Sequence, residues 1–175
     1  HASLMNLILT LSTFFILRKF KLSNFFSFFY SVIFAIIAYP LSGTPFLDHH
    51  AIFFCILAIY SYIVALKDKK KFFWCCIPIF LLLAFFSKQT PSAYLSLFLG
   101  LFILMYFYFN FSLKLFSSVI FSSLFFLALI LFFLLIYEIK ISDLYNQYIS
   151  YPSHIGGIRM NAEAFLTPVN FSRYI

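Results

Sequence analysis

Residues 115–137 read LFSSVIFSSLFFLALILFFLLIY, a stretch that contains no charged residue. A helix that crosses the hydrocarbon core of a bilayer needs about 20 consecutive, predominantly apolar residues. This stretch satisfies that requirement by itself, and its few polar groups are hydroxyls. We therefore predict a membrane-spanning helix over residues 115–137.

The composition of the whole chain agrees with a membrane protein. Hydrophobic residues make up 64% of the 175 residues, and charged residues make up only 10%. An ordinary globular domain has about 45–50% apolar and about 25% charged residues. A soluble chain of this length has too little interior to bury so much apolar surface, whereas a bilayer acts as an apolar solvent. The composition excludes an ordinary soluble domain.

Polar breaks divide the chain into further apolar stretches of the same kind. We expect an all-α polytopic membrane protein in which residues 1–137 form a bundle of about six membrane-spanning helices. Some stretches are shorter than ~20 residues, and flanking Lys and Tyr side chains extend such helices by reaching toward the interface. The expected spans are residues 2–17, 25–41, 51–66, 72–87, 91–109 and 115–137.

Residues 138–175 are polar and are expected to begin an extracytoplasmic segment. We predict a short helix over residues 142–150, followed by a loop that contains Pro152 and the pair Gly156-Gly157. The chain starts at His1 rather than at Met and stops at Ile175 without a recognisable end. We therefore expect it to be a piece of a longer protein.

The positions of the basic residues predict the orientation. Alternate connections carry eight of the 12 Lys and Arg residues, and the positive-inside rule places these connections in the cytoplasm. Short basic clusters between apolar stretches also argue against a nucleic-acid partner despite the net charge of +7. The eight residues are Arg18, Lys19, Lys21, Lys67, Lys69, Lys70, Lys71 and Lys114.

The first candidate site is Asp48 with the neighbouring His49 and His50, just before the third expected span and on the outward face. One interpretation is that Asp48 caps the helix and complements its dipole. The other is that Asp48 acts as a base, or binds a divalent metal ion together with His49. Adjacent helical residues point in different directions, so both histidines are not expected to bind one ion.

Two further candidates share the outward face. Lys88, followed by Gln89, lies in the turn SKQT and is either a cation at a helix C-terminus or a contact for a lipid phosphate. Arg159 follows a Gly-Gly pair, and its guanidinium is either solvated or binds a phosphate or carboxylate. Gln147 and His154 are weaker candidates. A carboxylate with cations at a membrane surface suits a lipid-linked phosphate ester, although many transporters also meet this description.

Three segments give the chain a resemblance to a known family: HASLMNLILTLSTFFILRKF (1–20), TPFLDHHAIFF (44–54) and FFSKQTPSAYL (85–95). In this order and spacing, they resemble the GT-C superfamily of membrane glycosyltransferases, which includes protein O-mannosyltransferases and aminoarabinose transferases. The resemblance covers nearly the whole chain, although its motifs are short and degenerate.

The resemblance implies an activity and roles for the candidate residues. It implies a polyprenyl-phosphate sugar donor in the outer leaflet, and a glycan, lipid or protein acceptor whose hydroxyl loses its proton to a carboxylate. Asp48 matches the second acidic position of the family, which implies a supporting or metal-linked part in catalysis. Lys88 and Arg159 would be contacts to the lipid phosphate. The family's principal base is expected before His1, so this chain alone is expected to be inactive. The supporting residues would be His49, His50, Gln89 and Gln147.

Two other functions remain open. A transporter or flippase of lipid-linked glycans predicts polar or charged residues inside the spans, and these spans contain few beyond Ser and Tyr. A polysaccharide polymerase or ligase needs Arg and His in a large outward loop, where Arg159 and His154 are the candidates. The three cysteines all lie inside apolar stretches, and a bacterial inner membrane with a periplasmic active face is our preferred location.

Overall fold

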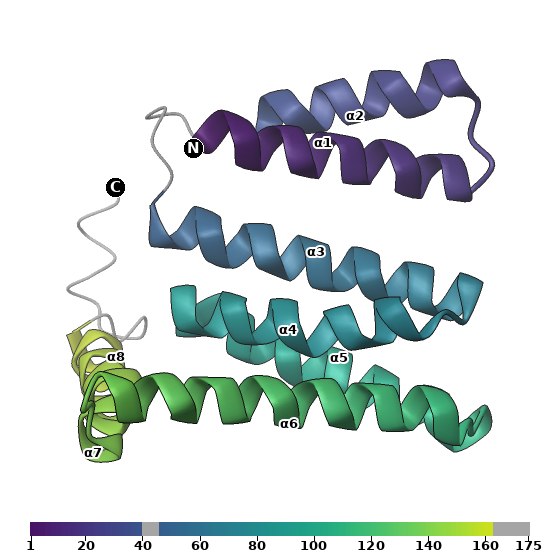
Figure 1. Ribbon diagram of the computed structural model, residues 1–175. Helices are drawn as coiled ribbons and strands as arrows, with labels where there is room; N and C mark the ends of the chain where they lie inside the picture. The colour runs from purple at the N-terminus through teal and green to yellow at the C-terminus, as the bar shows by residue number, and fades with distance from the viewer. Residues whose placement is uncertain (40–45, 163–175) are drawn as a thin grey trace, which may run out of the picture. The chain divides into compact units, whose positions relative to one another are not determined.

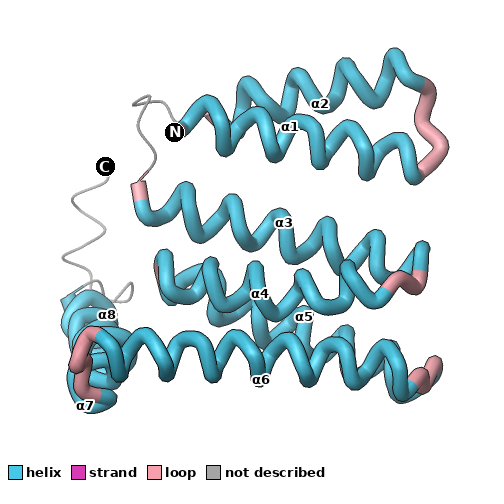
Figure 2. Tube along the Cα trace, viewed as in Figure 1, coloured by secondary structure: helices cyan, strands magenta, loops and turns pink. Residues whose placement is uncertain are grey.

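The computed structural model describes residues 1–39 and 46–162, and of residues 91 and 158–162 it describes the backbone only. These residues form helices and no strand, as the sequence predicts (Figure 1, Figure 2). The helices are α1 (Ala2–Lys19), α2 (Asn24–Ala38), α3 (Leu47–Asp68), α4 (Lys71–Ser87), α5 (Gln89–Phe109), α6 (Leu113–Ile136), α7 (Ile141–Tyr145), a π-helical turn (Asn146–Ser150) and α8 (Tyr151–Ala162).

The chain divides into two compact units, His1–Leu127 and Ala128–Ile175. In the first unit, α1 to α5 and the first part of α6 run up and down beside one another (Figure 1). The closest pairs are α3 with α4 and α1 with α2, because short turns join them as antiparallel hairpins. The first unit contains Asp48 and Lys88, and the second contains Gln147, His154 and Arg159.

Four of the described helices are long and apolar enough to cross a membrane: Ala2–Lys19, Leu47–Asp68, Ser92–Phe109 and Leu113–Ile136. These helices indicate a membrane protein. The other two expected spans, α2 and α4, are apolar but have only 15 and 17 residues. At 1.5 Å per residue they are about 23 Å and about 26 Å long, whereas the hydrocarbon core is about 30 Å thick. The expected total of six spans therefore stays a prediction.

The basic turns after α1 and after α3 lie at the same end of the first unit (Figure 1). Lys19 at the end of α1 forms an ion pair with Asp68 at the end of α3, and Lys67 donates a hydrogen bond to the Lys19 carbonyl. Each turn reverses the chain through a Lys residue with positive φ, 64° at Lys21 and 52° at Lys69. The two turns that carry seven of the eight basic residues assigned to one face are thus held together.

The main core of the first unit surrounds Trp74 on α4, which is fully buried. The indole contacts Tyr62 edge-on, with ring centroids 6.1 Å apart, and packs against Tyr106 and Phe107 at 5.0 Å. This aromatic cluster joins α3, α4 and α5. Many other large apolar side chains are exposed, such as Leu97 at 72%, and such a surface suits contact with lipid.

The second unit contradicts the prediction of a loop after residue 150. The chain is helical from Ile141 to Tyr145 and through the π-helical turn, but it then continues as α8 rather than as the predicted loop. Pro152 directly follows the π-helical turn, whose last hydrogen bond runs from the Tyr151 N–H to the Asn146 carbonyl, and it has no N–H to continue the ladder. Gly156 and Gly157 lie inside α8, and apart from their chain neighbours and the adjacent backbone of the helix no described atom lies within 4 Å of where a Cβ would stand on either. Neither close packing nor a turn explains these two glycines.

Candidate functional site

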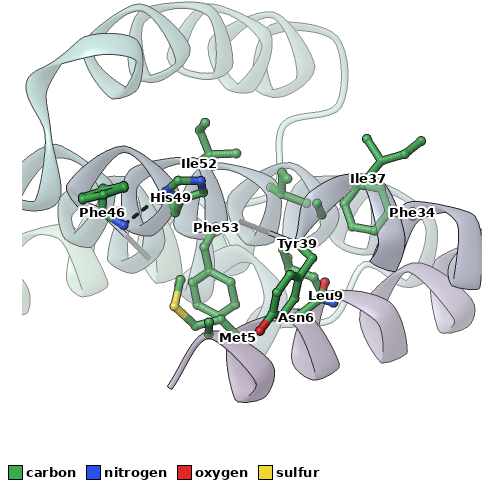
Figure 3. A pocket seen from close by; sticks show the side chains of 13 residues that line it. Met5, Asn6, Leu9, Phe34, Ile37, Tyr39, Phe46, His49, Ile52 and Phe53 are labelled. Carbon is green, nitrogen blue, oxygen red and sulfur yellow. Dashed lines mark hydrogen bonds between the residues drawn. The ribbon is translucent and has the colours of Figure 1, made fainter. Parts of the chain in front are cut away.

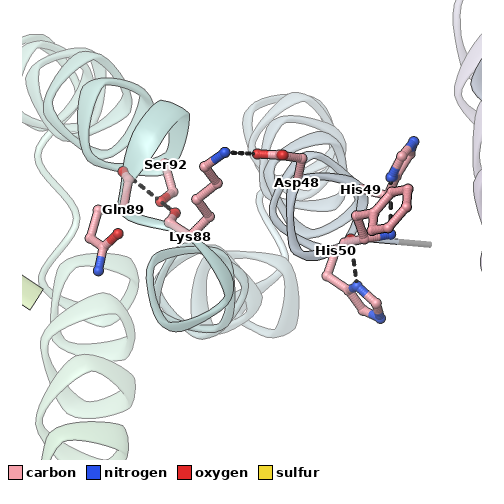
Figure 4. Close-up of polar contacts among 7 residues, drawn as sticks. Asp48, His49, His50, Lys88, Gln89 and Ser92 are labelled. Atoms are coloured by element: carbon pink, nitrogen blue, oxygen red, sulfur yellow. Dashed lines mark hydrogen bonds and ion pairs between the residues drawn. The ribbon is translucent and has the colours of Figure 1, made fainter. Parts of the chain in front are cut away.

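The structure joins two of the predicted site residues that lie 40 positions apart. The Asp48 carboxylate forms an ion pair with Lys88 Nζ (Figure 4). The side chains are 53% and 44% exposed, respectively, so the pair lies at the surface of the first unit. An exposed pair of this kind contributes about 0–1 kcal/mol to stability in water. The ion pair between Asp48 and Lys88 therefore contributes little to folding stability.

Antiparallel pairing of α3 and α4 brings the two residues together. Asp48 lies in the first turn of α3, and Lys88 follows the last residue of α4. Lys88 has an extended backbone (φ −160°, ψ 133°), and its N–H donates to the Ala84 carbonyl at 2.9 Å. Both charges also complement the helix dipoles, negative at an N-terminus and positive at a C-terminus.

The interpretation of Asp48 as a helix cap is only partly correct. The N-cap residue of α3 is Phe46, and its N–H donates to His49 Nδ1 at 3.2 Å. Asp48 is the second helical residue, where its charge suits the dipole, but its carboxylate is directed at Lys88 (Figure 4). This geometry leaves a carboxylate and an ammonium group together at the surface, with no backbone group between them.

The histidines have separate hydrogen bonds. His50 Nδ1 lies 2.9 Å from the Phe46 carbonyl, which can only accept, so this nitrogen carries a proton. In a neutral ring His50 Nε2 then accepts, and His1 Nε2, 2.8 Å away, donates to it. The two rings also stack, with centroids 5.0 Å apart. His50 is thus held by Phe46 and His1 rather than by Asp48.

Asp48 and His49 do not converge on a common point, since the carboxylate faces Lys88 and the imidazole lies on the other side of α3 (Figure 4). Over the described ranges, no three or more His, Cys, Asp or Glu residues lie close enough to hold a metal ion. The arrangement therefore does not fit an ion shared by these two residues. Metal dependence stays a prediction that the geometry does not support.

Of the remaining candidates, only Gln89 lies in the same unit as this pair, and it does not join it. Gln89 follows Lys88, and its side chain points away from Asp48, while its carbonyl accepts from the Ser92 hydroxyl at 2.9 Å (Figure 4). Gln147 is exposed in the π-helical turn of the second unit. Arg159 lies on α8 of that unit, among the residues described by their backbone only. The roles of Gln147 and Arg159 stay predictions from the resemblance.

A cavity of about 600 Å³ lies between α1, α2 and α3 beside His49 (Figure 3). Its wall is mainly apolar, and His49, Asn6 and Tyr39 are its polar members. Asn6 Nδ2 donates to the Ala35 carbonyl at 3.0 Å, whereas Asn6 Oδ1 is buried without a hydrogen-bond partner among the described residues. The apolar lining consists of Ala2, Met5, Leu9, Phe34, Ile37, Ala38, Phe46, Ile52, Phe53 and Ile56.

Asn6 is a polar member of this cavity that the sequence-based prediction missed. An amide inside an apolar span was a usable signal, because a polar side chain at membrane depth is costly unless it is paired. An unpaired buried acceptor costs about 1–3 kcal/mol, so Asn6 Oδ1 would gain from a donor that enters the cavity.

Comparisons of this chain with protein-family models, with curated proteins and with solved structures find no match.

Proposed function

We propose that this chain is part of a GT-C-type membrane glycosyltransferase, which moves a sugar from a polyprenyl-phosphate donor to a hydroxyl of a glycan, lipid or protein. The observation that carries the proposal is the ion pair between Asp48 and Lys88. These residues belong to two of the segments that resemble the family, and the fold places their side chains in contact. A carboxylate beside a cation is the minimum that transfer from a lipid phosphate requires.

The proposed reaction inverts the configuration of the sugar. The acceptor oxygen attacks the anomeric carbon and loses its proton to a carboxylate. The bond between that carbon and the phosphate oxygen breaks, and its electron pair leaves with the polyprenyl phosphate. Lys88 stabilises the charge that grows on the departing phosphate. Donor binding would draw Lys88 away from Asp48 and free this carboxylate to bind or deprotonate the acceptor.

The cavity beside His49 supports the proposal. Its apolar wall suits the first isoprene units of a donor, and His49, which follows Asp48 in the chain, is one of its polar members (Figure 3). By the resemblance alone, Arg159 is proposed as a phosphate contact and Gln147 as a supporting residue. No step of the proposed reaction requires a metal ion.

A transfer assay tests the proposal. Membranes that contain the intact protein are supplied with a labelled polyprenyl-phosphate sugar, and the release of polyprenyl phosphate is measured with and without acceptor. We expect acceptor-dependent release that falls about 100-fold in Lys88→Gln, because one charge-stabilising contact is lost. Movement of the intact labelled donor between leaflets, without any release, would instead support the flippase. Release that is unchanged in Lys88→Gln would remove Lys88 from the site.

The proposal also requires that α2 and α4 cross the membrane, which gives six spans and one face that holds Asp48 and Lys88. This face is proposed to be the periplasmic face of a bacterial inner membrane. We expect alkaline phosphatase to be active when fused after residue 47 or 89 and inactive when fused after residue 22 or 70. A fluorescent protein that folds only in the cytoplasm should give the opposite pattern. If the fusions after residues 22 and 47 report the same side, α2 does not span and the six-span topology is wrong.

A further inference from the structure

A second cavity, of about 480 Å³, lies between α1, α3 and α4 in the first unit. It lies away from Asp48 and His49, and neither residue lines it. Its polar members are few: Ser12, Ser61 and Tyr60 in the wall, and Lys19 at one end. The apolar lining consists of Ile8, Phe15, Ile16, Leu57, Val64, Phe72, Phe73, Cys76 and Phe80.

Contacts between α1 and α3 hold this cavity open. Met5 and Leu9 pack against Phe53 toward one end of the pair of helices. In the middle, the Thr13 hydroxyl and the Tyr60 hydroxyl lie 2.7 Å apart in a hydrogen bond. At the far end Lys19 meets Asp68. These contacts join α1 to α3, and the cavity lies between these two helices and α4.

Positive charge gathers at the Lys19 end of this cavity. The turns after α1 and α3 meet there, and among their residues Asp68 is the only carboxylate. Lys67 Nζ donates a hydrogen bond to the Lys19 carbonyl and lies over the Phe20 ring, 5.3 Å from its centroid. Lys70 and Lys71 directly precede Phe72, which lines the cavity. The basic residues of the two turns are Arg18, Lys19, Lys21, Lys67, Lys69, Lys70 and Lys71.

We propose that this cavity binds an anionic phospholipid, with an acyl chain between α1, α3 and α4 and the phosphate at Lys19, Lys70 and Lys71. An apolar space that ends in a group of cations complements a molecule with one apolar chain and one anionic head. Basic pockets between membrane helices bind anionic lipid head groups for this reason. The site is independent of the proposed sugar transfer, since it shares no residue with the Asp48 region.

Spin-labelled lipids test this proposal in vesicles of phosphatidylcholine that contain the full chain. The motionally restricted fraction is measured with labelled phosphatidylglycerol and with labelled phosphatidylcholine. We expect the protein to prefer phosphatidylglycerol, and we expect the triple variant Lys19→Gln, Lys70→Gln, Lys71→Gln to lower that preference at least fivefold. Ser12→Phe, which fills the cavity and keeps the charges, should lower it as well.

Two controls separate the lipid site from loss of structure and from charge in general. Asp68→Asn breaks the same ion pair as Lys19→Gln but leaves Lys19 free, so the preference should be kept or increased. Lys114→Gln, in the first turn of α6, should leave it unchanged. Equal restriction of the two lipids by the unaltered chain overturns the proposal. So does a preference that survives Ser12→Phe, because the charges would then bind lipid without the cavity.

Discussion

Replacement of Asp48 by asparagine in the intact protein is expected to reduce sugar transfer about 100-fold or more, while the protein stays folded. The substitution removes the negative charge that positions Lys88 and that would help the principal base to bind the acceptor hydroxyl. The lost ion pair costs little stability, because both side chains are about half exposed. The measurement is the initial rate of polyprenyl-phosphate release, with thermal unfolding in the same detergent as the check on folding.

The chain contains a matched control for this substitution. Asp68, at the opposite end of α3, also pairs with a Lys residue, and Asp68→Asn removes that ion pair without touching the proposed site. It should leave the transfer rate within about twofold of the original. A large fall in Asp68→Asn would show that transfer depends on the packing of α3 rather than on a reacting carboxylate.

A charge exchange distinguishes a structural role of Asp48 from a role in transfer. The double variant Asp48→Lys, Lys88→Asp can form the ion pair with its charges reversed, although each charge then opposes a helix dipole. If the pair only joins α3 to the turn after α4, this variant recovers most of the transfer lost in Asp48→Asn. If the carboxylate and the cation have separate chemical roles, it stays inactive. We expect the second result.

The sequence predicts where the helices lie better than it predicts which helices and side chains contact one another. The apolar stretches predicted the bounds of α1, α3, α4 and α6 to within a few residues. A bilayer demands length and apolarity in a spanning helix, and both are visible in the sequence. The start of α5 was predicted at residue 91, within two residues of its observed start. Its helix extends back to Gln89 through the non-helical Thr90, so the regular span begins only at Ser92.

The contact between Asp48 and Lys88 could be predicted only in part. A Lys-rich turn between two apolar stretches placed both residues on one face, but the register of α3 against α4 depends on side-chain packing that no spacing reveals. The same limitation applies to the cavity beside His49, since Asn6 and Phe53 line it from helices far apart in the sequence. The helix through Gly156-Gly157 was mispredicted because two adjacent glycines usually favour a turn.

Truncation of Trp74 to alanine is expected to have the largest effect on stability of any single substitution in the first unit. The indole is fully buried and joins three helices, so its removal leaves a cavity that its neighbours on different helices cannot all fill. Large-to-small changes of this kind cost about 3–5 kcal/mol. Packing is the main force between membrane helices, so most of that cost should remain in a bilayer or a micelle.

Two comparisons identify packing as the reason for this loss. Trp74 Nε1 is buried without a hydrogen-bond partner in the described part of the chain, so Trp74→Phe breaks no hydrogen bond and keeps a ring in the cluster. It should cost less than about 1.5 kcal/mol. Phe98→Ala, at a position 61% exposed on α5, should cost less still, because lipid replaces the lost ring. The free energy of unfolding is measured by titration with a denaturing detergent. Equal losses in Trp74→Ala and Phe98→Ala would show that the aromatic cluster does not hold α3, α4 and α5 together.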